Sequence, residues 1–277
     1  MINFKYLKKM RFDRFNKLVN LETKNYLRYA IGEVVLVVAG ILIALQVNNW
    51  NELKKQEKDE KKILLSLHNE ISSSILNCEL VINKRKEVLS AGEEILKYTS
   101  PNGIWKSQYK LDSLIFHITN SGWRHVPQEG VLNEIINSGK LSLITENRLR
   151  TQISSLPRAY SQMIENDRIN RLNNTVNIVP LFYGKSILKN VTNYIEPFKF
   201  SKTPLGYTKF KVSYNLLLRD PEIEDALSYQ NTYQKYGVEF LEKVRLKYFN
   251  IQELIEAKYP DVDYVKLDKD LDRGVWN

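Results

Sequence analysis

The chain contains three histidines and one cysteine, the residue types that most often bind transition metals or serve as bases and nucleophiles. No two of His68, His117 and His125 are three or four residues apart, so no helical metal-binding pair exists. Glycines are too sparse for a phosphate-binding loop or a nucleophile elbow. We therefore expect no catalytic residues and no cofactor, and we expect His68 to be an ordinary surface residue.

Three aspartates near the end of the sequence, Asp268, Asp270 and Asp272, alternate as the first ligands of a calcium-binding loop do. Gly274 comes one position too late for such a loop, and no glutamate follows at the twelfth position. We expect residues 260–277 to be a solvated acidic tail, with calcium binding as the alternative.

The remaining reactive side chains allow several interpretations. Cys78 lies on an apolar stripe, which predicts a small buried hydrophobe, and a disulfide between two copies of the chain is the alternative. Glu129 and Glu134 are carboxylates that a hydrolase acting on envelope material would use, and nothing else motivates that activity. Asp167 and Arg171 have the spacing of an exposed ion pair on a helix.

The formal charge of +9 is concentrated in a short leader. Residues 1–28 carry eight Lys or Arg and two Asp or Glu, so this leader holds two thirds of the excess charge. A nucleic-acid-binding protein more often gathers basic residues on a folded face. A basic leader beside an apolar segment is typical of a tail held at anionic lipid, so we expect membrane lipid and not nucleic acid as a partner.

Residues 29–50 are expected to form a transmembrane helix. The stretch from Tyr29 to Val47 reads YAIGEVVLVVAGILIALQV, which as a helix would be about 28 Å long, close to the ~30 Å of bilayer hydrocarbon. Tyr26, Tyr29 and Trp50 flank it as interfacial aromatic residues do. No small-residue cleavage site follows, which favours an uncleaved signal anchor over a cleaved signal peptide or a buried core helix.

The distribution of basic residues predicts the orientation of this span. Eight precede it, and five lysines follow it between positions 54 and 62. The excess favours a cytoplasmic N-terminus, a single pass through the inner membrane and a periplasmic C-terminal domain.

One face of the predicted span carries Glu33, Gly40 and Ala44. Gly40 and Ala44 form a small-x-x-x-small pair, which allows two helix backbones to approach closely. Self-association with Glu33 as a polar contact is one interpretation. The other is that small residues are common in spans and that Glu33 only reaches the interface.

Beyond the span the pattern predicts a mainly all-α protein. Residues 51–98 carry apolar residues at helical spacing and are expected to continue the span as one long amphipathic helix. Residues 99–259 predict further helices of a bundle outside the cytoplasm. Pro157 is expected to kink or interrupt one of them, and Asp220 followed by Pro221 predicts the start of the last long helix.

Residues 183–215 contain prolines, glycine and short β-like runs, which predict a small irregular or β-containing insertion. Four tyrosines in it are expected to lie in the core under a long loop, with a ligand or partner surface as the alternative. They are Tyr183, Tyr194, Tyr207 and Tyr214.

The run YAIGEVVLVVAGILIALQVNNWNE behind a basic leader resembles the opening of a family of single-pass membrane proteins from Bacteroidota, especially marine flavobacteria. That family is catalogued as a domain of unknown function. The charged run KKQEKDEKKILLSLHNEI and residues 132–154 are also similar to it, whereas residues 155–160 depart from it. The resemblance implies membrane anchoring and an α-rich extracytoplasmic domain, and it implies no activity and no catalytic residue.

These observations favour a membrane-anchored helical protein that binds a partner or senses a signal in the cell envelope and self-associates. An envelope-acting hydrolase and a passive structural spacer are the alternatives.

Overall fold

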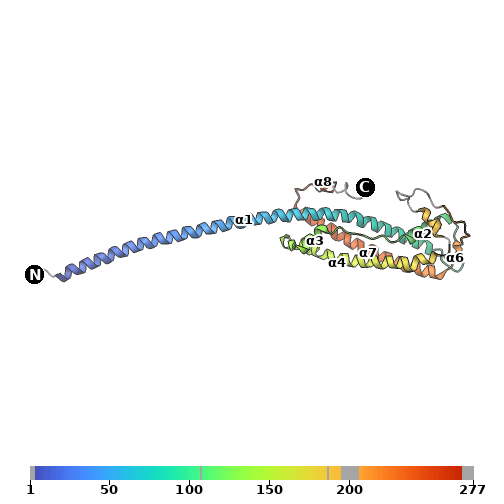
Figure 1. Cartoon of the computed structure of the whole chain (residues 1–277), viewed down its shortest axis with the longest axis horizontal. Coiled ribbons are helices and arrows are strands. Elements are labelled where there is room, and N and C mark those ends of the chain that lie inside the picture. Colours follow the sequence, from blue (N-terminus) through green and yellow to red (C-terminus); the bar gives the residue numbers. More distant parts are fainter. Residues whose placement is uncertain (1–3, 107, 186, 195–205, 270–277) are drawn as a thin grey trace. The chain divides into compact units, whose positions relative to one another are not determined.

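The computed structural model describes residues 4–106, 108–185, 187–194 and 206–269. The chain divides into two compact units, Met1–Asp59 and Glu60–Asn277. Helix α1 runs from Phe4 to Leu96 and supplies residues to both units (Figure 1).

In the first unit, α1 exposes its apolar side chains. Every residue from 31 to 59 is exposed. Near the N-terminus this helix is long and apolar enough to cross a membrane, and none of its most apolar window is buried. A continuous helix satisfies its backbone hydrogen bonds internally, as a segment in hydrocarbon must.

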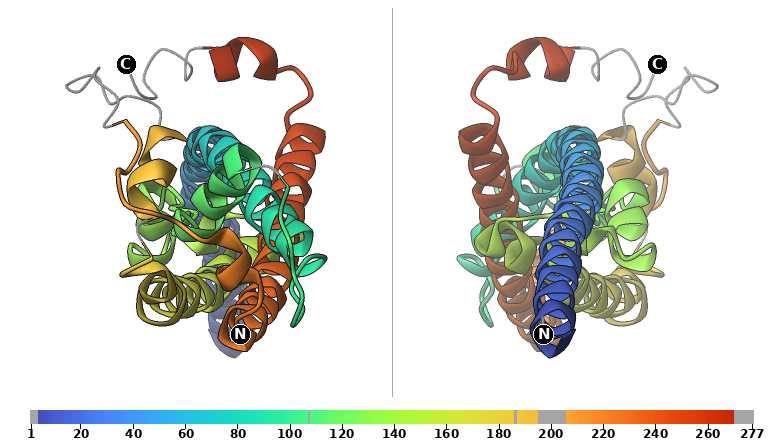
Figure 2. Two further views of the ribbon diagram at one scale, coloured as in Figure 1. Left: turned by 90° about the vertical axis from the view of Figure 1, so that its right-hand side faces the viewer. Right: turned by 90° about the vertical axis from the view of Figure 1, so that its left-hand side faces the viewer.

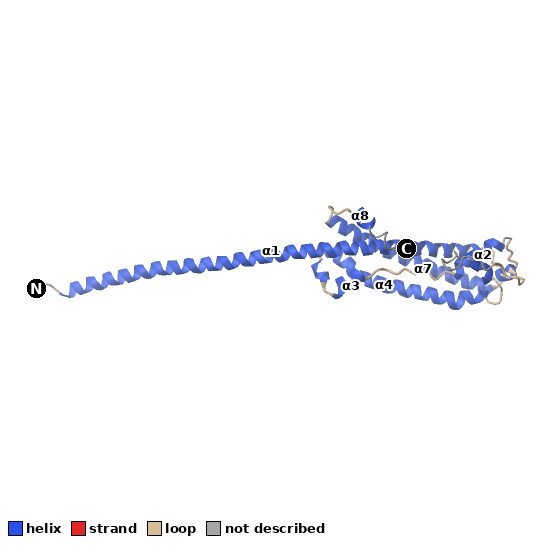
Figure 3. Cartoon of the chain, turned by 45° about the horizontal axis from the view of Figure 1, so that its top comes forward, coloured by secondary structure: helices blue, strands red, loops and turns tan. Residues whose placement is uncertain are grey.

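The second unit is a bundle in which the later part of α1 lies beside α4 and α7 (Figures 1 and 2). The described residues form helices and no strand (Figure 3), which confirms the predicted all-α class. The elements after α1 are α2 (Gln108–Thr119), α3 (Gly130–Asn137), η1 (Lys140–Leu143), α4 (Asn147–Asn173), η2 (Asn174–Ile178), η3 (Val179–Phe182), α5 (Leu188–Val191), η4 (Thr192–Tyr194), α6 (Tyr214–Leu218), α7 (Pro221–Lys258) and α8 (Tyr264–Lys269).

Two separate apolar clusters form the core of this bundle. The first joins α1, α3, α4 and α7 through residues such as Leu64, Leu156 and Ile251. The second joins the end of α1 to α2, α6 and the start of α7 through residues such as Ile115 and Leu227. The apolar stripe predicted for residues 51–98 supplies α1 to both clusters, and Cys78 is fully buried in the first, as predicted.

A band of buried polar side chains separates the two clusters along the helices. Among the buried apolar residues of α1, the first cluster ends at Ile82 and the second begins at Ala91. On α7 the second cluster ends at Leu227 and the first begins at Leu241, while α4 contributes only to the first cluster, as far as Met163. We call this band the polar layer and define it as Arg85, Asp167, Asn170, Gln230, Asn231 and Gln234.

Side chains fix the starts of two helices. At α7 the Asp220 side chain accepts a hydrogen bond from the Glu222 amide and Pro221 occupies the first turn, as predicted. At α3 the cap comes from a distant residue: Glu70 of α1 accepts hydrogen bonds from the amides of Val131 (2.6 Å) and Leu132 (2.9 Å). Burial nevertheless raises the pKa of Glu70, because desolvation outweighs these bonds.

Two local predictions need correction. Pro157 does not interrupt its helix, since α4 continues through it with Pro157 exposed. Tyr183 and Tyr207 are exposed, not in the core, whereas Tyr214 is buried and donates a hydrogen bond to Asp112. The Tyr194 side chain lies outside the described residues, and the described part of residues 183–215 is irregular and helical.

Candidate functional site

Five of the predicted membrane residues lie on the exposed part of α1. Tyr29 is 76% exposed and Trp50 is 59% exposed. Glu33, Gly40 and Ala44 are exposed too, and a Cβ added at Gly40 would have no neighbouring atom within 4 Å. Within the first unit this face is therefore open to a second helix or to lipid.

Some predicted site residues fall outside the structure. Tyr26 lies in α1, but its side chain lies outside the described residues. The same holds for the side chain of Asp268 at the end of α8, and Asp270 and Asp272 are not described at all. The calcium alternative therefore stays a prediction. Elsewhere in the described residues, no group of three or more His, Cys, Asp or Glu is placed to hold a metal ion.

A buried ion pair lies at the centre of the polar layer. Arg85 Nη2 on α1 is 2.5 Å from Asp167 Oδ1 on α4, and the two side chains are 1% and 8% exposed. Arg85 also donates to Gln234 Oε1 at 3.4 Å. Burial lowers the pKa of Arg85 and raises the pKa of Asp167, in each case against the attraction of the partner. Asp167 is thus not the exposed partner of Arg171 that the sequence predicted.

The helices approach each other closely around this pair because glycine faces a long polar side chain on the neighbouring helix. A Cβ at Gly237 of α7 would collide with the guanidinium of Arg85. Reciprocally, a Cβ at Gly92 of α1 would collide with the amide of Asn231 on α7. The polar layer therefore fixes the register between α1 and α7 through shape as well as through hydrogen bonds.

His125 attaches the loop between α2 and α3 to the bundle beside this layer. Asn77 Oδ1 accepts from the Val126 amide at 3.1 Å and lies 2.7 Å from His125 Nδ1. Nδ1 therefore carries the proton, and His125 Nε2 accepts from the Tyr248 hydroxyl at 3.0 Å. Burial lowers the pKa of His125 to about 4, so the imidazole is neutral at pH 7.

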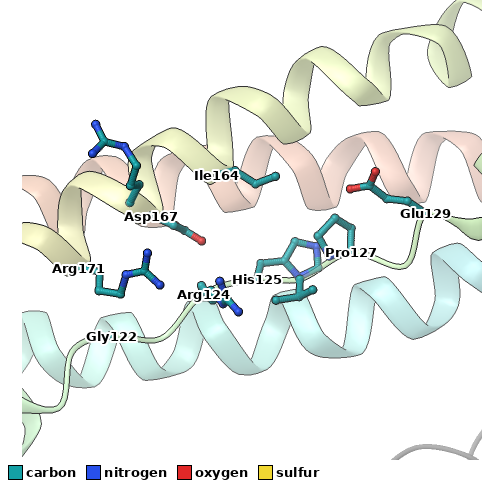
Figure 4. Close-up of a pocket in the computed structure, with 10 residues that line it drawn as sticks. Gly122, Arg124, His125, Pro127, Glu129, Ile164, Asp167 and Arg171 are labelled. Atoms are coloured by element: carbon teal, nitrogen blue, oxygen red, sulfur yellow. The ribbon is translucent and has the colours of Figure 1, made fainter. Parts of the chain in front are cut away.

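A pocket of about 310 Å³ opens between this loop and α4 (Figure 4). The loop contributes Arg124, His125, Val126, Pro127 and Glu129. Helix α4 contributes Ile164, Asp167, Arg168 and Arg171. The volume is in the range of small-molecule sites, and the lining combines apolar, cationic and anionic groups.

The three arginines at the pocket differ in their partners. Arg168 forms two hydrogen bonds to Glu165, at 2.9 and 2.8 Å. Arg124 and Arg171 make no salt bridge with any carboxylate in the described part of the chain. Figure 4 shows the Arg171 side chain extending from α4 toward the loop that carries Arg124. The pocket therefore has two arginines that can bind an anion.

The other candidate catalytic residues are not assembled into a site. Glu134 is exposed and pairs with Lys140, while Glu129 lines the pocket. His68 is buried, and its Nε2 lies 3.0 Å from a carboxylate oxygen of Glu256 on α7, so the prediction of a surface histidine was wrong. It lies on the inward side of α1, where a polar partner from α7 allows its burial.

Sequence reasoning missed the polar layer and the pocket, although one signal was present. Arg85 occupies the stripe position between Ile82 and Leu89, where an apolar residue would continue the rhythm. A charge at such a position requires a buried counter-charge. The sequence does not show that the counter-charge is Asp167, because helical spacing is local and this contact joins residues far apart in the chain.

Comparisons with known proteins give a family and no activity. The model of a family of unknown function (DUF6090) matches residues 33–201, more than half of the chain. The match includes every residue that lines the pocket, and it ends before α7. No curated protein and no solved structure matches the chain.

Proposed function

The chain belongs to the family of unknown function DUF6090, and we propose that it is a single-pass protein of the inner membrane whose helical domain, in the periplasm, binds a partner and self-associates. The observation that carries this proposal is the exposed apolar segment of α1. Each aliphatic side chain there would gain roughly 1.5–3 kcal/mol on leaving water, which lipid provides. The similarity of this segment to Bacteroidota membrane proteins supports an envelope location.

Fractionation tests the anchor. The full chain is expected to sediment with membranes after lysis without detergent, to resist a wash at alkaline pH that removes peripheral proteins, and to dissolve only in detergent. Recovery of the chain in the supernatant before detergent is added would refute the membrane location.

The single cysteine makes the orientation easy to test. Cys78 is fully buried and burial raises the pKa of its thiol to about 12, so it reacts slowly with maleimides. Two variants, Asn20→Cys in the leader and Ser90→Cys at an exposed position of α1, place a reactive thiol on either side of the span. In spheroplasts, an impermeant maleimide is expected to label Ser90→Cys and to label Asn20→Cys only after lysis. The opposite pattern would reverse the orientation.

Self-association is proposed to use the face that contains Gly40 and Ala44. Crosslinking in native membranes is expected to trap a dimer, and Gly40→Leu is expected to reduce its yield because a bulky side chain separates the helices. Gly32→Leu is the matched control: Gly32 is equally free of neighbours within 4 Å but lies on another face of α1. Equal loss of dimer in both variants, or no dimer in the wild type, would contradict this interface.

A further inference from the structure

The pocket between α4 and the loop before α3 has an uneven distribution of charge. Arg124 and Arg171 lie toward one end of it and Glu129 lies toward the other (Figure 4). Arg168 also lines the pocket, but Glu165 already binds its guanidinium through two hydrogen bonds. The cationic end is therefore formed by Arg124 and Arg171, neither of which has a salt-bridge partner among the described residues.

The Asp167 carboxylate interacts electrostatically with both arginines but does not cancel their charge. Asp167 lines the pocket, but it is 8% exposed and its Oδ1 is bonded to the buried guanidinium of Arg85. A pair of opposite charges in contact presents little net field to the pocket. An incoming anion at Arg124 and Arg171 therefore meets two cations and a neutralised carboxylate.

An apolar wall lies along the pocket. Ile164 is 52% exposed and Val126 is 57% exposed, and Pro127 completes the lining on the loop side. Large aliphatic side chains this exposed gain free energy when a ligand covers them. Guanidinium groups bind planar oxyanions through paired hydrogen bonds, so a head group at the cationic end would hold an apolar body against this wall.

We propose that this pocket binds a small anion in which an oxyanion head group is joined to a short apolar body, with the head group on Arg124 and Arg171 and the body on Ile164 and Val126. Glu129 repels a second anionic group at the other end, so the preferred ligand is a monoanion. This inference goes beyond membrane anchoring and partner binding, and it holds or fails independently of them.

Calorimetric titration of the full chain in detergent micelles tests the proposal, with hexanoate as the probe and acetate and inorganic phosphate for comparison. Hexanoate is expected to bind with a Kd of about 1 mM or below and about tenfold more tightly than acetate, because only hexanoate reaches the apolar wall. Binding is expected to weaken as salt is added. If the heat measured on adding hexanoate is no larger with the protein than with micelles alone, the proposal is wrong.

Three arginine variants locate the head group. Arg124→Gln and Arg171→Gln are each expected to weaken hexanoate binding about tenfold, since each removes a charge-assisted hydrogen bond. Arg168→Gln, which removes the same charge from the same helix, is expected to change it less than about twofold because Glu165 already engages that guanidinium. If all three variants lose the same amount of hexanoate affinity, the effect comes from overall positive charge and the proposed site is wrong.

A fourth variant tests the apolar body. Ile164→Ser is expected to weaken hexanoate binding and to leave acetate binding unchanged. The unfolding midpoint serves as the folding control for the arginine variants: a loss of hexanoate binding in Arg124→Gln with an unchanged midpoint supports a direct contact. If phosphate binds as tightly as hexanoate, or if Ile164→Ser has no effect on hexanoate, the apolar body is wrong.

Discussion

Folded proteins usually bury apolar side chains and expose polar ones. The exposed segment of α1 at residues 29–50 and the polar layer of the bundle both show the opposite arrangement. The first exposes Val, Leu and Ile side chains, and the second buries an arginine, an aspartate and several amides. The two inversions are resolved differently. The polar layer finds its partners within the chain, as Arg85 does with Asp167. The apolar segment has no such partner in the first unit, and in the proposed anchored protein its partner is lipid or another helix.

The difference shows where the molecule can be altered without loss of folding. A buried ion pair is often no more stabilising than well-packed apolar side chains, but removing one partner leaves the other charge buried and unpaired, so single changes in the polar layer are costly. The apolar segment is exposed within the first unit and is proposed to contact lipid. Changes in the polar layer are therefore expected to alter the free energy of unfolding. Changes in the apolar segment are expected to alter whether the chain sediments with membranes.

The largest expected effect is on the apolar segment. Leu36→Arg together with Ile43→Arg places two charges near the middle of the predicted span, at a cost of about 5–7 kcal/mol for insertion. Most of the chain is then expected in the soluble or degraded fraction after sedimentation. Leu76→Arg with Leu80→Arg is the control, since it adds the same charges at exposed positions of the second unit. Sedimentation of both double variants with membranes would count against the span.

The next effect concerns the buried ion pair. Asp167→Ala leaves the Arg85 charge buried without its partner and is expected to lower the free energy of unfolding by about 3–5 kcal/mol. Urea unfolding followed by circular dichroism measures it. Arg85→Met combined with Asp167→Leu is expected to recover most of the loss, while Glu165→Ala, which removes an exposed pair, is expected to change little. A double variant as unstable as Asp167→Ala alone would show that the charges themselves are needed.

Between pH 4 and 7, the free energy of unfolding is expected to depend on the protonation of the His125 imidazole. The unfolded chain protonates this histidine near pH 6.5, whereas the folded chain does so only near pH 4. Its contribution is therefore complete above about pH 7 and is lost as the pH falls through 6.5 toward 4, by on the order of 3 kcal/mol. His125→Asn is expected to flatten the profile over this range. His117→Asn, at a more exposed histidine, is expected to flatten it less.

The smallest expected effect is measured by comparing two glycines. Gly237 lies against Arg85 of the polar layer, and Gly40 lies in the apolar segment. Gly237→Ala forces the Arg85 guanidinium to move and is expected to lower the free energy of unfolding by about 1–3 kcal/mol. Gly40→Ala adds a methyl group where no atom lies within 4 Å and is expected to leave urea unfolding unchanged. Similar losses in the two variants would mean that residues 29–50 take part in the folded bundle.

Local patterns predicted the local structure well. The apolar rhythm predicted the helices, and Asp220 with Pro221 predicted the start of α7. These features depend on residues that are neighbours in sequence, so propensity and spacing are sufficient to identify them.

The contacts of the candidate site could not be predicted in the same way. Arg85 meets Asp167, and His68 meets Glu256, only because separate helices pack in one register. That register depends on the shapes of whole helix faces, including glycines such as Gly237 that carry no apolar or charged signal. The charge of Arg85 within the apolar rhythm of α1 was a signal that sequence reasoning missed, and it does not identify Asp167 as the partner.

The carboxylate of Glu70 ties the formation of α3 to that of the bundle. An isolated helix of eight residues is unstable in water, and α3 receives the acceptors for its first amides from a side chain that lies more than fifty residues earlier in the chain. We therefore expect the first turn of α3 to form only after α1 has docked and to be lost early in unfolding. The rate of amide hydrogen exchange at the first turn of α3 would therefore report the docking of α1 rather than the intrinsic stability of α3.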